Sequence, residues 1–543
     1  MTTSRVAAHA VDPASVMWSP DPEVVLENAF QRPFENAVAT ARTCYSSKGI
    51  VHADEVSGEE LPTEAERAER RRKRDDLALS IYRAGHHTTL QHCQFQFAIS
   101  GVSRQFIWSF LHAHPFYNSE QVSQRYVKVK PGSYAIPPLT GRAREQYVQI
   151  CDGLQRAYAE LTQMLLQPAA AEYDRRFPAR RRSQQARKYD KDIQKKAQEV
   201  ARYVLPLGTL AYLYHSVSGL TLLRYHRMQN SPDTTTEQRV VVGKMIGALI
   251  KLDPLFAQLL EQPIVLEDSL EHAAAVACPA TAERRAEFAR EFDLELGGRR
   301  ARLVAYHAGA ERVLADAVRE VLGVPAAALS DAAAIARVLD PSQNSYLGST
   351  LNLAAHSKLM RALVHVTYTF KKKLSHTADS QDQRHRMVPG SRPVLSRHLG
   401  DAPDYVTPGL IASEPRIRAH FDGIMQRLWA DVAELRRLGA SDEFALYALP
   451  NAIAVRFTES GDLQNLHHKW TSRLCYNAQE EIFAASLDEV QQVAAVHPEI
   501  ARFLLAPCGL RVRAGIAPYC PEGERYCGVP VWKLKLDRYQ RVI

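Results

Sequence analysis

The chain has 543 residues, with 68 Lys and Arg against 60 Asp and Glu, which gives a formal net charge of +8 with 46% hydrophobic residues. This length and balance predict several domain-sized units and exclude a short disulfide-stapled or a disordered polypeptide. No apolar run reaches the ~18 residues of a membrane helix, the first twenty residues lack a signal-peptide pattern, and eight sparse cysteines favour reduced thiols, so we expect a cytoplasmic protein without membrane contact.

Strand-like and helix-like patterns alternate near the start of the chain. The sequence VVLENA after Glu23 predicts a short strand, and apolar residues recur at helical spacing over 33–43. A charged insert follows over 49–76, which we interpret as a solvated helix face or a loop. In HCQFQFAI, residues 92–99, apolar and polar side chains alternate, which predicts a half-buried strand.

A basic stretch over residues 174–196 carries ten Arg and Lys residues and favours a helix. A solvated helical face accounts for it, with attraction of phosphates as the alternative. The modest net charge of the whole chain permits an anionic ligand and does not imply nucleic acid.

The sequence repeats itself weakly, and the similar segments form three pairs. The pairs are EVVLENAFQRPFENAVATAR at Glu23 with ARLVAYHAGAERVLADAVRE at Ala301, ARYVLPLGT at Ala201 with ALYALPNAI at Ala445, and SQRYVKVKPGSY at Ser123 with DQRHRMVPGSRP at Asp382. They predict two copies of one fold, 20–275 and 298–543, joined by the charged stretch 281–300.

Two segments of the first half carry candidate chemistry. QVSQRY, residues 121–126, places a permanent cation among short hydrogen-bonding groups on a loop, where Arg125 suits a phosphate or carboxylate and a structural salt bridge is the alternative. GHHTTLQH, residues 85–92, has three histidines within seven positions ahead of a strand, which favours a polar cleft over isolated core histidines.

In the second half, Arg473 precedes AQEEI on a helical pattern, and an ion pair with a nearby glutamate is its structural interpretation. The tail APCGLRVRAGIAPYCPEGERYCG holds Cys508, Cys520 and Cys527, which would bind zinc with a fourth ligand such as Cys475 or His468. Because the spacing is not a paired CxxC, we favour packed free thiols.

Taken in order, these motifs resemble the flavin-dependent thymidylate synthases. The family's pattern runs in the order GHxSxxEH, a strand, SRxxxxQxxRHR, a SxQxSQRY-like loop and RxxLP. This chain has similar segments in the same order, namely GHHTTLQH, a strand, SRQFIWSFLHAH, SEQVSQRY and ARYVLPLGT. DLQNLHHKWTSRLCYNAQEEI from Asp462 is similar to the closing signature NxRxLxxFLxLR followed by AQxEI.

The resemblance implies an α/β (α+β) fold, with a central antiparallel sheet and flanking helices in each copy. It implies methylation of dUMP to dTMP, with methylenetetrahydrofolate as carbon donor and FAD reduced by NADPH as hydride donor. Members assemble as homotetramers with active sites between subunits, so a fused pair needs only a homodimer.

Several positions depart from the family pattern. The RHR triplet is His112-Ala113-His114 in the first copy, the acidic residue of GHxSxxEH is Gln91, and the ring-ionising arginine falls on Gln229. In the second copy the repeat comparison places Asp382 at the serine and Arg384 opposite Arg125, so we interpret Lys371, Lys372 and Lys373, and not Arg384 to Arg386, as the cations of the motif.

The two copies therefore retain complementary parts, which predicts one composite site. The resemblance assigns substrate binding to Gln121, Val122, Ser123, Gln124, Arg125, Arg202, Lys371 and Lys372, catalysis to Arg473, and FAD contacts to Thr88, His112, His114, Gln121, Gln464 and His468. A uracil anion needs a permanent cation in a water-poor cleft, so the second composite position, with Asp382, Leu446 and Gln229, is expected to be inactive. The alternatives are a scaffold protein that has lost catalysis, or a flavin enzyme that modifies pyrimidines in a nucleic acid.

Overall fold

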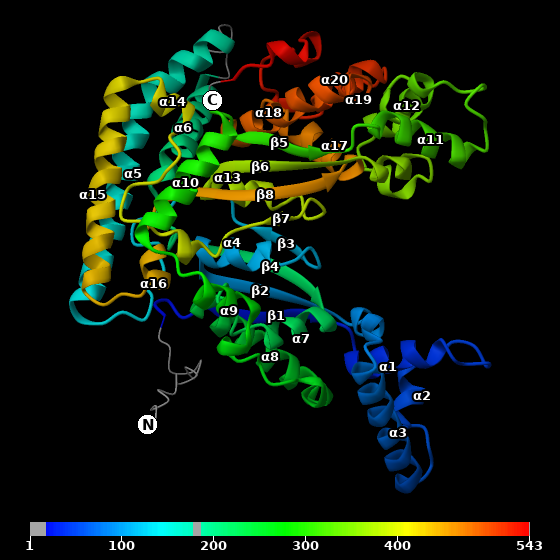
Figure 1. Ribbon diagram of the computed structural model, residues 1–543. Coiled ribbons are helices and arrows are strands. Elements are labelled where there is room, and N and C mark those ends of the chain that lie inside the picture. The colour runs from blue at the N-terminus through cyan, green and yellow to red at the C-terminus, as the bar shows by residue number, and fades with distance from the viewer. Residues whose placement is uncertain (1–17, 178–185, 542) are drawn as a thin grey trace.

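A computed structural model describes residues 18–177, 186–541 and 543. Two four-stranded antiparallel sheets stand one above the other, with strand orders β1-β2-β4-β3 and β5-β6-β8-β7 (Figure 1). The strands are β1 (Glu23–Ala29), β2 (Gln94–Ser103), β3 (Asn118–Gln121), β4 (Leu210–Ser218), β5 (Ala301–Tyr306), β6 (Thr367–Ser375), β7 (Gly390–Ser391) and β8 (Ala454–Asp462). The identical order confirms the predicted fold class and the two tandem copies. Their exact limits, 20–275 and 298–543, stay a prediction.

The central strands β2 and β6 follow the predicted alternation of buried and solvent-facing side chains. β2 pairs Ile99 with Leu213 and Val102 with Ala211, so β2 holds one extra residue at this point. Gly101 lies in this bulge with a φ of +68°, a left-handed conformation that glycine adopts without steric cost. β6 pairs with β8 without such an interruption.

Each central strand ends at a serine that caps the next helix. Ser103 accepts a hydrogen bond from the Phe106 amide at the start of α4 (Arg104–His112), and Ser375 accepts one from Ala378 in α13 (His376–Asp382). The Glu237 carboxylate accepts from the Ser103 amide and hydroxyl at 2.7 and 2.5 Å. The Glu481 carboxylate binds Ser375 in the same way, with both distances 2.6 Å. These carboxylates dock the helices α8 (Thr236–Leu252) and α18 (Glu480–Val496) onto the ends of the central strands.

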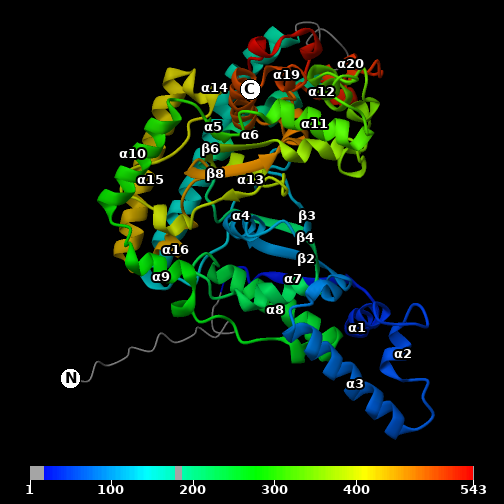
Figure 2. The ribbon, with the colours of Figure 1, turned by 45° about the vertical axis from the view of Figure 1, so that its right-hand side comes forward.

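The predicted early elements are confirmed. The strand after Glu23 is β1, the helix over 33–43 is α1 (Pro33–Thr43), and the alternating segment is β2. The charged insert forms α2 (Ala53–Ser57) and α3 (Glu64–Arg83), and α3 projects away from the sheets (Figure 2). The basic stretch is helical at both ends, in α5 (Gly141–Arg176) and α6 (Ala186–Ala201), while residues 178–185 lie outside the described part.

One hydrophobic cluster is shared by the two copies, and each copy also has a cluster of its own. Around the paired prolines, the Leu207 amide donates to the Leu449 carbonyl at 2.7 Å and the Asn451 amide donates to the Leu205 carbonyl at 2.8 Å. Beside this junction, α5 packs against α15 (Pro415–Arg437), and buried residues of both copies form a single cluster. The junction therefore fixes the two sheets relative to each other through buried backbone as well as side chains.

The remaining helices flank the two sheets. They are α7 (Gly219–Arg227), α9 (Leu270–Ala277), α10 (Ala282–Leu296) within the predicted linker, α11 (Ala310–Leu322), α12 (Asp331–Leu339), α14 (Gly409–Ala412), α16 (Asp442–Leu446), α17 (Leu463–Arg473), α19 (Pro498–Ala501) and α20 (Pro507–Arg513). None of the helices in the described part of the chain is long and apolar enough to cross a bilayer.

Candidate functional site between the two copies

The strand registers decide which residues of the two copies correspond. Ser103 pairs with Leu210, and Ser375 pairs with Ala454. Leu210 and Ala454 each stand four residues after the proline of their Leu-Pro pair. Ser103 and Ser375 are therefore equivalent, and counting onward places Arg384 opposite His112.

This register overturns the predicted assignment of the second copy. Gln381 and the triplet Arg384, His385 and Arg386 now fall on the motif SRxxxxQxxRHR, which the segment SHTADSQDQRHR matches at every position except the first arginine. The placement of Arg384 opposite Arg125 is wrong, because it compared similar letters across two loops of different length. The second copy thus retains the RHR triplet that the first copy has lost.

The triplet reaches across to the first copy. Arg384 forms an ion pair with Glu120 at 2.7 Å. Arg386 donates to the Pro115 carbonyl and the Asn118 side chain at 3.2 and 3.1 Å, and its guanidinium lies 5.1 Å from the centre of the Tyr117 ring. A cavity of about 280 Å³ opens beside these two arginines over β2, β3 and β4. A neighbouring hollow of about 420 Å³ shares Tyr117, Asn118 and Arg386 with it.

Arg125 of the first copy reaches in the opposite direction. Its Nε donates to Glu199 at 2.9 Å, and its Nη2 donates to the Asn477 carbonyl of the second copy at 2.8 Å. Burial alone would lower the pKa of Arg125, but Glu199 outweighs this effect and raises it. The loop 121–126 is thus held against the loop 474–479, which follows Arg473.

Arg473 lies at the end of α17 and is partly buried. Its Nε donates to His385 Nε2 at 2.9 Å, and its Nη2 donates to the Gln381 carbonyl at 2.8 Å. Burial lowers the pKa of Arg473 to about 10 against the opposing charge of Asp382, and Arg125 and Arg384 lower it further. The guanidinium therefore stays charged at neutral pH, and its observed partners are not the glutamate of the structural interpretation.

Arg202 has hydrogen-bonding groups without partners. It is 4% exposed, and its Nε and Nη2 are buried with no hydrogen-bond partner among the described residues. The side-chain nitrogens of Gln124 and Gln381 are in the same situation. Buried donors are nearly always satisfied in native proteins, so these three side chains indicate a place where a ligand accepts hydrogen bonds.

The surrounding charge is positive. Burial, followed by the charges of Arg202 and Arg384, lowers the pKa of Arg104 to about 10. Burial also lowers the pKa of Arg202, and the charge of Arg125 adds to this effect. These effects of one arginine's charge on the pKa of another indicate that five arginines lie close together. They are Arg104, Arg125, Arg202, Arg384 and Arg473. Such a cluster favours an anion with several acceptor oxygens.

The lysines predicted to bind substrate lie elsewhere. Lys372 is fully buried and forms ion pairs with Asp382 at 2.6 Å, Glu489 at 2.9 Å and Glu459 at 3.3 Å. Lys371 forms an ion pair with Glu295 on the outer side of the second sheet. Neighbouring carboxylates thus hold both ammonium groups, and contact of Lys371 and Lys372 with a ligand stays a prediction.

The second composite position is filled by side chains. Asp379 accepts a hydrogen bond from Trp108 Nε1 at 2.8 Å, lies 3.3 Å from His112 Nε2, and pairs with Arg392 at 3.0 Å. Burial lowers the pKa of His112 to about 4, so this ring is neutral. Leu446, which corresponds to Arg202, is 2% exposed. This arrangement agrees with the expectation that the second position lacks an anion site.

The residues predicted to contact FAD are dispersed. Thr88 lies in a turn of 3₁₀ helix over His87–Gln91, and Gln121 accepts from Arg104 at 2.8 Å. His114 is hydrogen bonded to the Tyr225 hydroxyl at 2.8 Å. Gln464 donates to the Ala354 carbonyl at 3.1 Å, and the His468 ring centre lies 6.0 Å from that of His385.

The alternative of a zinc site concerns the C-terminal cysteines. Within the described ranges, no group of three or more His, Cys, Asp and Glu side chains is placed to hold a metal ion. Cys508, Cys520 and Cys527 are free thiols, and Cys508 and Cys527 pack against the second copy's core.

Comparison with known proteins places both copies in one family. The model of the thymidylate synthase complementing protein family matches residues 25–255 and 302–499. The flavin-dependent thymidylate synthase of Clostridium tetani is 26% identical over 240 residues, which cover 44% of this chain and 81% of the relative. The enzyme of the same name from Nitratidesulfovibrio vulgaris is 30% identical over 196 residues, covering 34% and 76%. That from Geobacter sulfurreducens is 30% identical over 170 residues, covering 31% and 70%. The chain belongs to the thymidylate synthase complementing protein family, whose sequence pattern it contains twice.

Proposed function

We propose that the chain is a flavin-dependent thymidylate synthase with one composite active site. It would methylate dUMP to dTMP, with methylenetetrahydrofolate as carbon donor and NADPH as reductant. The observation that carries this proposal is the arginine cluster assembled from both copies, in which buried Arg202 nitrogens have no hydrogen-bond partner within the described part of the chain. A nucleotide monophosphate has the charge and the acceptor oxygens that such a cluster binds.

Each copy contributes a different part of the nucleotide site. The phosphate and sugar would be bound by Arg125 and Arg202 of the first copy. The Ser123 hydroxyl would join them, as would the remaining residues of the loop, Gln121, Val122 and Gln124. Gln381 and Arg384 of the second copy would complete this grip. Fixed donors in a buried site bind an anion without reorganising.

Arg473 would act on the base. Transfer of the one-carbon unit to C5 of uracil places negative charge on the ring nitrogen N3 and the carbonyl O2. A guanidinium that stays protonated stabilises this charge more in the transition state than in the ground state. The His385 ring, whose pKa is lowered well below its ordinary value by burial and then by Arg473, is neutral and can orient Arg473 by accepting its Nε–H.

The residues beside Arg386 are suited to FAD. The two adjoining hollows offer about 280 and 420 Å³ and are lined by Tyr117, by polar groups of β3 and β4 and by the RHR arginines. Arg386 would pair with a pyrophosphate, and polar groups of β3 and β4 would contact the rest of the cofactor. When bound, reduced FAD supplies the hydride of the reaction.

The filled second position limits each chain to one nucleotide. A homodimer, which we propose as the assembly, would then bind two. Tyr212 and Tyr214 of β4 are 57% and 53% exposed, and a second chain would cover these rings. Light scattering that gives the mass of a single 60.9 kDa chain would contradict the dimer.

The decisive assay is release of tritium from 5-labelled dUMP in the presence of FAD, NADPH and methylenetetrahydrofolate. We expect release from the unmodified chain, a yellow protein whose flavin absorbance bleaches with NADPH, and one dUMP bound per chain by calorimetry. A colourless protein that binds no dUMP would end the proposal and favour the scaffold.

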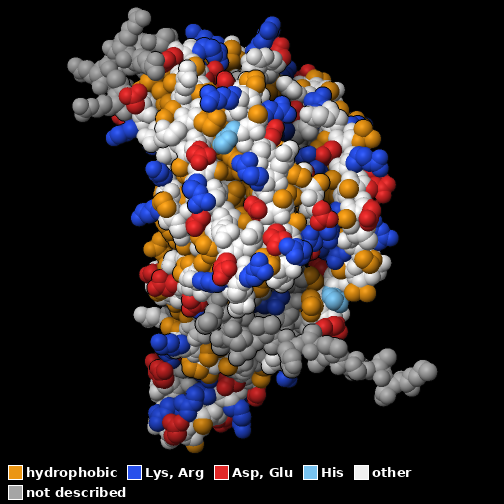
Figure 3. Space-filling model, turned by 90° about the vertical axis from the view of Figure 1, so that its left-hand side faces the viewer, with side chains coloured by type: hydrophobic (Ala, Val, Ile, Leu, Met, Phe, Trp, Pro, Cys, Tyr) orange, Lys and Arg blue, Asp and Glu red, His pale blue; other side chains and the backbone are white. Residues whose placement is uncertain are grey.

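The alternatives have lost their main support. The scaffold interpretation depended on a missing RHR triplet, which the second copy retains as Arg384–Arg386. On the face drawn in Figure 3, Lys and Arg side chains of the described residues are interspersed with Asp and Glu and form no continuous basic stripe. Binding of a nucleic acid favours such a stripe. Salt-sensitive retention of RNA or DNA would revive the nucleic-acid alternative.

A further inference from the structure

The C-terminal segment, residues 500–543, lies beyond the part that the family model matches. We infer that this segment is a clamp that holds the loop 474–479 in the position at which Arg125 and Arg473 meet the nucleotide. The inference rests on the proposed function for the identity of the ligand. It assigns a positioning role, because the clamp residues act on the site through the loop.

The clamp contacts three consecutive residues of the loop. The Gln540 amide donates to the Tyr476 hydroxyl at 2.9 Å. The Asn477 side chain donates to the Arg525 carbonyl at 2.6 Å, and Arg541 Nη1 donates to the Ala478 carbonyl. The C-terminal segment thus holds the loop through both its backbone and its side chains.

The same loop carries the contact between copies. The Asn477 carbonyl accepts the hydrogen bond of Arg125 at 2.8 Å, while its side chain is bound by the clamp. Arg473 ends the helix that leads directly into this loop. A displacement of Asn477 would therefore release Arg125 on one side and move the anchor of Arg473 on the other.

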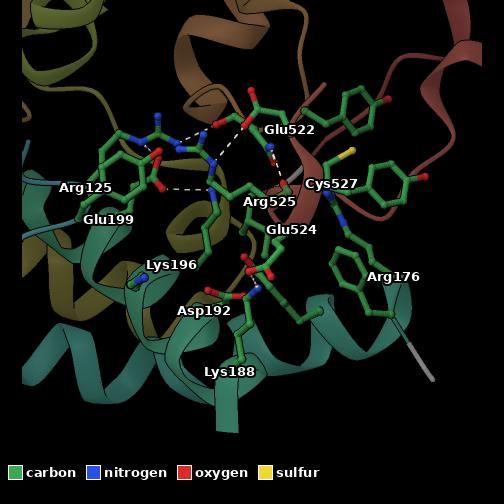
Figure 4. A pocket seen from close by; sticks show the side chains of 18 residues that line it. Arg125, Arg176, Lys188, Asp192, Lys196, Glu199, Glu522, Glu524, Arg525 and Cys527 are labelled. Carbon is green, nitrogen blue, oxygen red and sulfur yellow. Dashed lines mark hydrogen bonds and ion pairs between the residues drawn. The ribbon is translucent and has the colours of Figure 1, made fainter. Parts of the chain in front are cut away.

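The clamp also touches the first copy. Glu524 pairs with Lys188 of α6 at 2.7 Å. Figure 4 shows Arg125, Glu199 and Lys196 on one side of a cavity and Glu522, Glu524 and Arg525 of the clamp on the other. This cavity measures about 280 Å³. The clamp thus bridges α6 and the loop at the point where the two copies meet.

Arg541 is the strongest single contact of the clamp. Its Nε donates to the Ile543 carbonyl at 2.7 Å, and its Nη2 is buried without a partner among the described residues. A charged donor on a backbone carbonyl makes a stronger bond than a neutral one. Loss of Arg541 should therefore free the Ala478 end of the loop.

The test compares two clamp arginines that both bind backbone carbonyls. Arg541→Ala removes the contact to the loop, whereas Arg511→Ala removes donors to the Pro518 and Gly348 carbonyls, away from the loop. Arg541→Lys restores a charged donor. Equilibrium binding of dUMP and hydrogen–deuterium exchange of the loop amides are measured on each full-length variant, with thermal unfolding as the check of folding.

We expect Arg541→Ala to weaken dUMP binding and to speed amide exchange at residues 474–479, each by about tenfold or more, because one charge-assisted hydrogen bond is lost. Arg541→Lys should recover most of both, and Arg511→Ala should leave both unchanged. Equal effects of the two alanine variants, or unchanged exchange in Arg541→Ala, would overturn the clamp. If the unmodified chain binds no dUMP, the proposed function fails, and the exchange measurement still decides whether the loop is clamped.

Discussion

Replacement of Arg202 by leucine should strengthen the fold and weaken the nucleotide complex at the same time. The second copy already has leucine at the corresponding position, Leu446, where it is buried at 2% exposure. In Arg202 itself, two guanidinium nitrogens are buried without a hydrogen-bond partner among residues 18–177, 186–541 and 543. Glu199 would keep Arg125 and Lys196 as partners after the change.

The expected changes in the free energy of unfolding and in the Kd for dUMP follow from these unpaired guanidinium nitrogens. An unsatisfied buried donor costs about 1–3 kcal/mol, so Arg202→Leu should raise the free energy of unfolding of the ligand-free chain by about that amount. Two charge-assisted hydrogen bonds to a phosphate contribute at least about 3 kcal/mol, so the Kd for dUMP should rise roughly a hundredfold or more.

Urea denaturation measures the first quantity and isothermal calorimetry the second. Arg456→Leu is the matched control, because Arg456 is also buried but pairs with Asp293 and Asp404 at 2.8 and 2.5 Å on the second sheet. We expect this control to destabilise the chain and to leave the Kd unchanged. If Arg202→Leu behaves like the control, Arg202 is a structural residue and the reasoning about its unpaired nitrogens fails.

Three further changes test other parts of the account. Arg473→Ala should lower tritium release at least about a hundredfold by removing the cation at the base, whereas Gln229→Ala should leave it unchanged; equal losses would refute the single composite site. Lys372→Met should cost about 3–5 kcal/mol of unfolding free energy, because it strands buried carboxylates, and any change in the dUMP Kd beyond twofold would contradict its structural role. Burial raises the pKa of Glu237 from 4.5 to about 7, so the folded state retains a proton between these values that the unfolded chain releases. The free energy of unfolding should therefore fall by about 3 kcal/mol as the pH rises through this interval, and Glu237→Gln should flatten that slope in denaturation at a series of pH values.

Sequence patterns predicted several elements of the fold. Alternation in β2 and helical spacing in α1 are local signals, and the Leu-Pro pairs identified the repeat because both prolines lie at the junction of the copies. The charged insert 49–76 was less informative, since a solvated helix such as α3 has no apolar face that would distinguish it from a loop.

The site was predicted only in part. Arg125, Arg202 and Arg473 were found because each stands in a motif of constant spacing. The triplet Arg384–Arg386 was misassigned, because similar letters were compared although Asp382 stands 7 residues after Ser375 and Ser123 stands 20 residues after Ser103. Counting from Ser375 would have located Gln381 and Arg384 at the family's fixed spacing, but only the strand register shows that Ser375 and Ser103 correspond.

The two composite positions differ in their side chains, and this difference limits which halves of the chain can form a competent pair. In the proposed composite site, two copies of the front half would lack the guanidinium at the base, and two copies of the back half would lack the loop that grips the phosphate. Only a mixed pair would complete the proposed site, and the covalent tether keeps the two halves together at any cellular dilution. Random pairing of separated halves in equal amounts would give one inert self-pairing for every mixed pair.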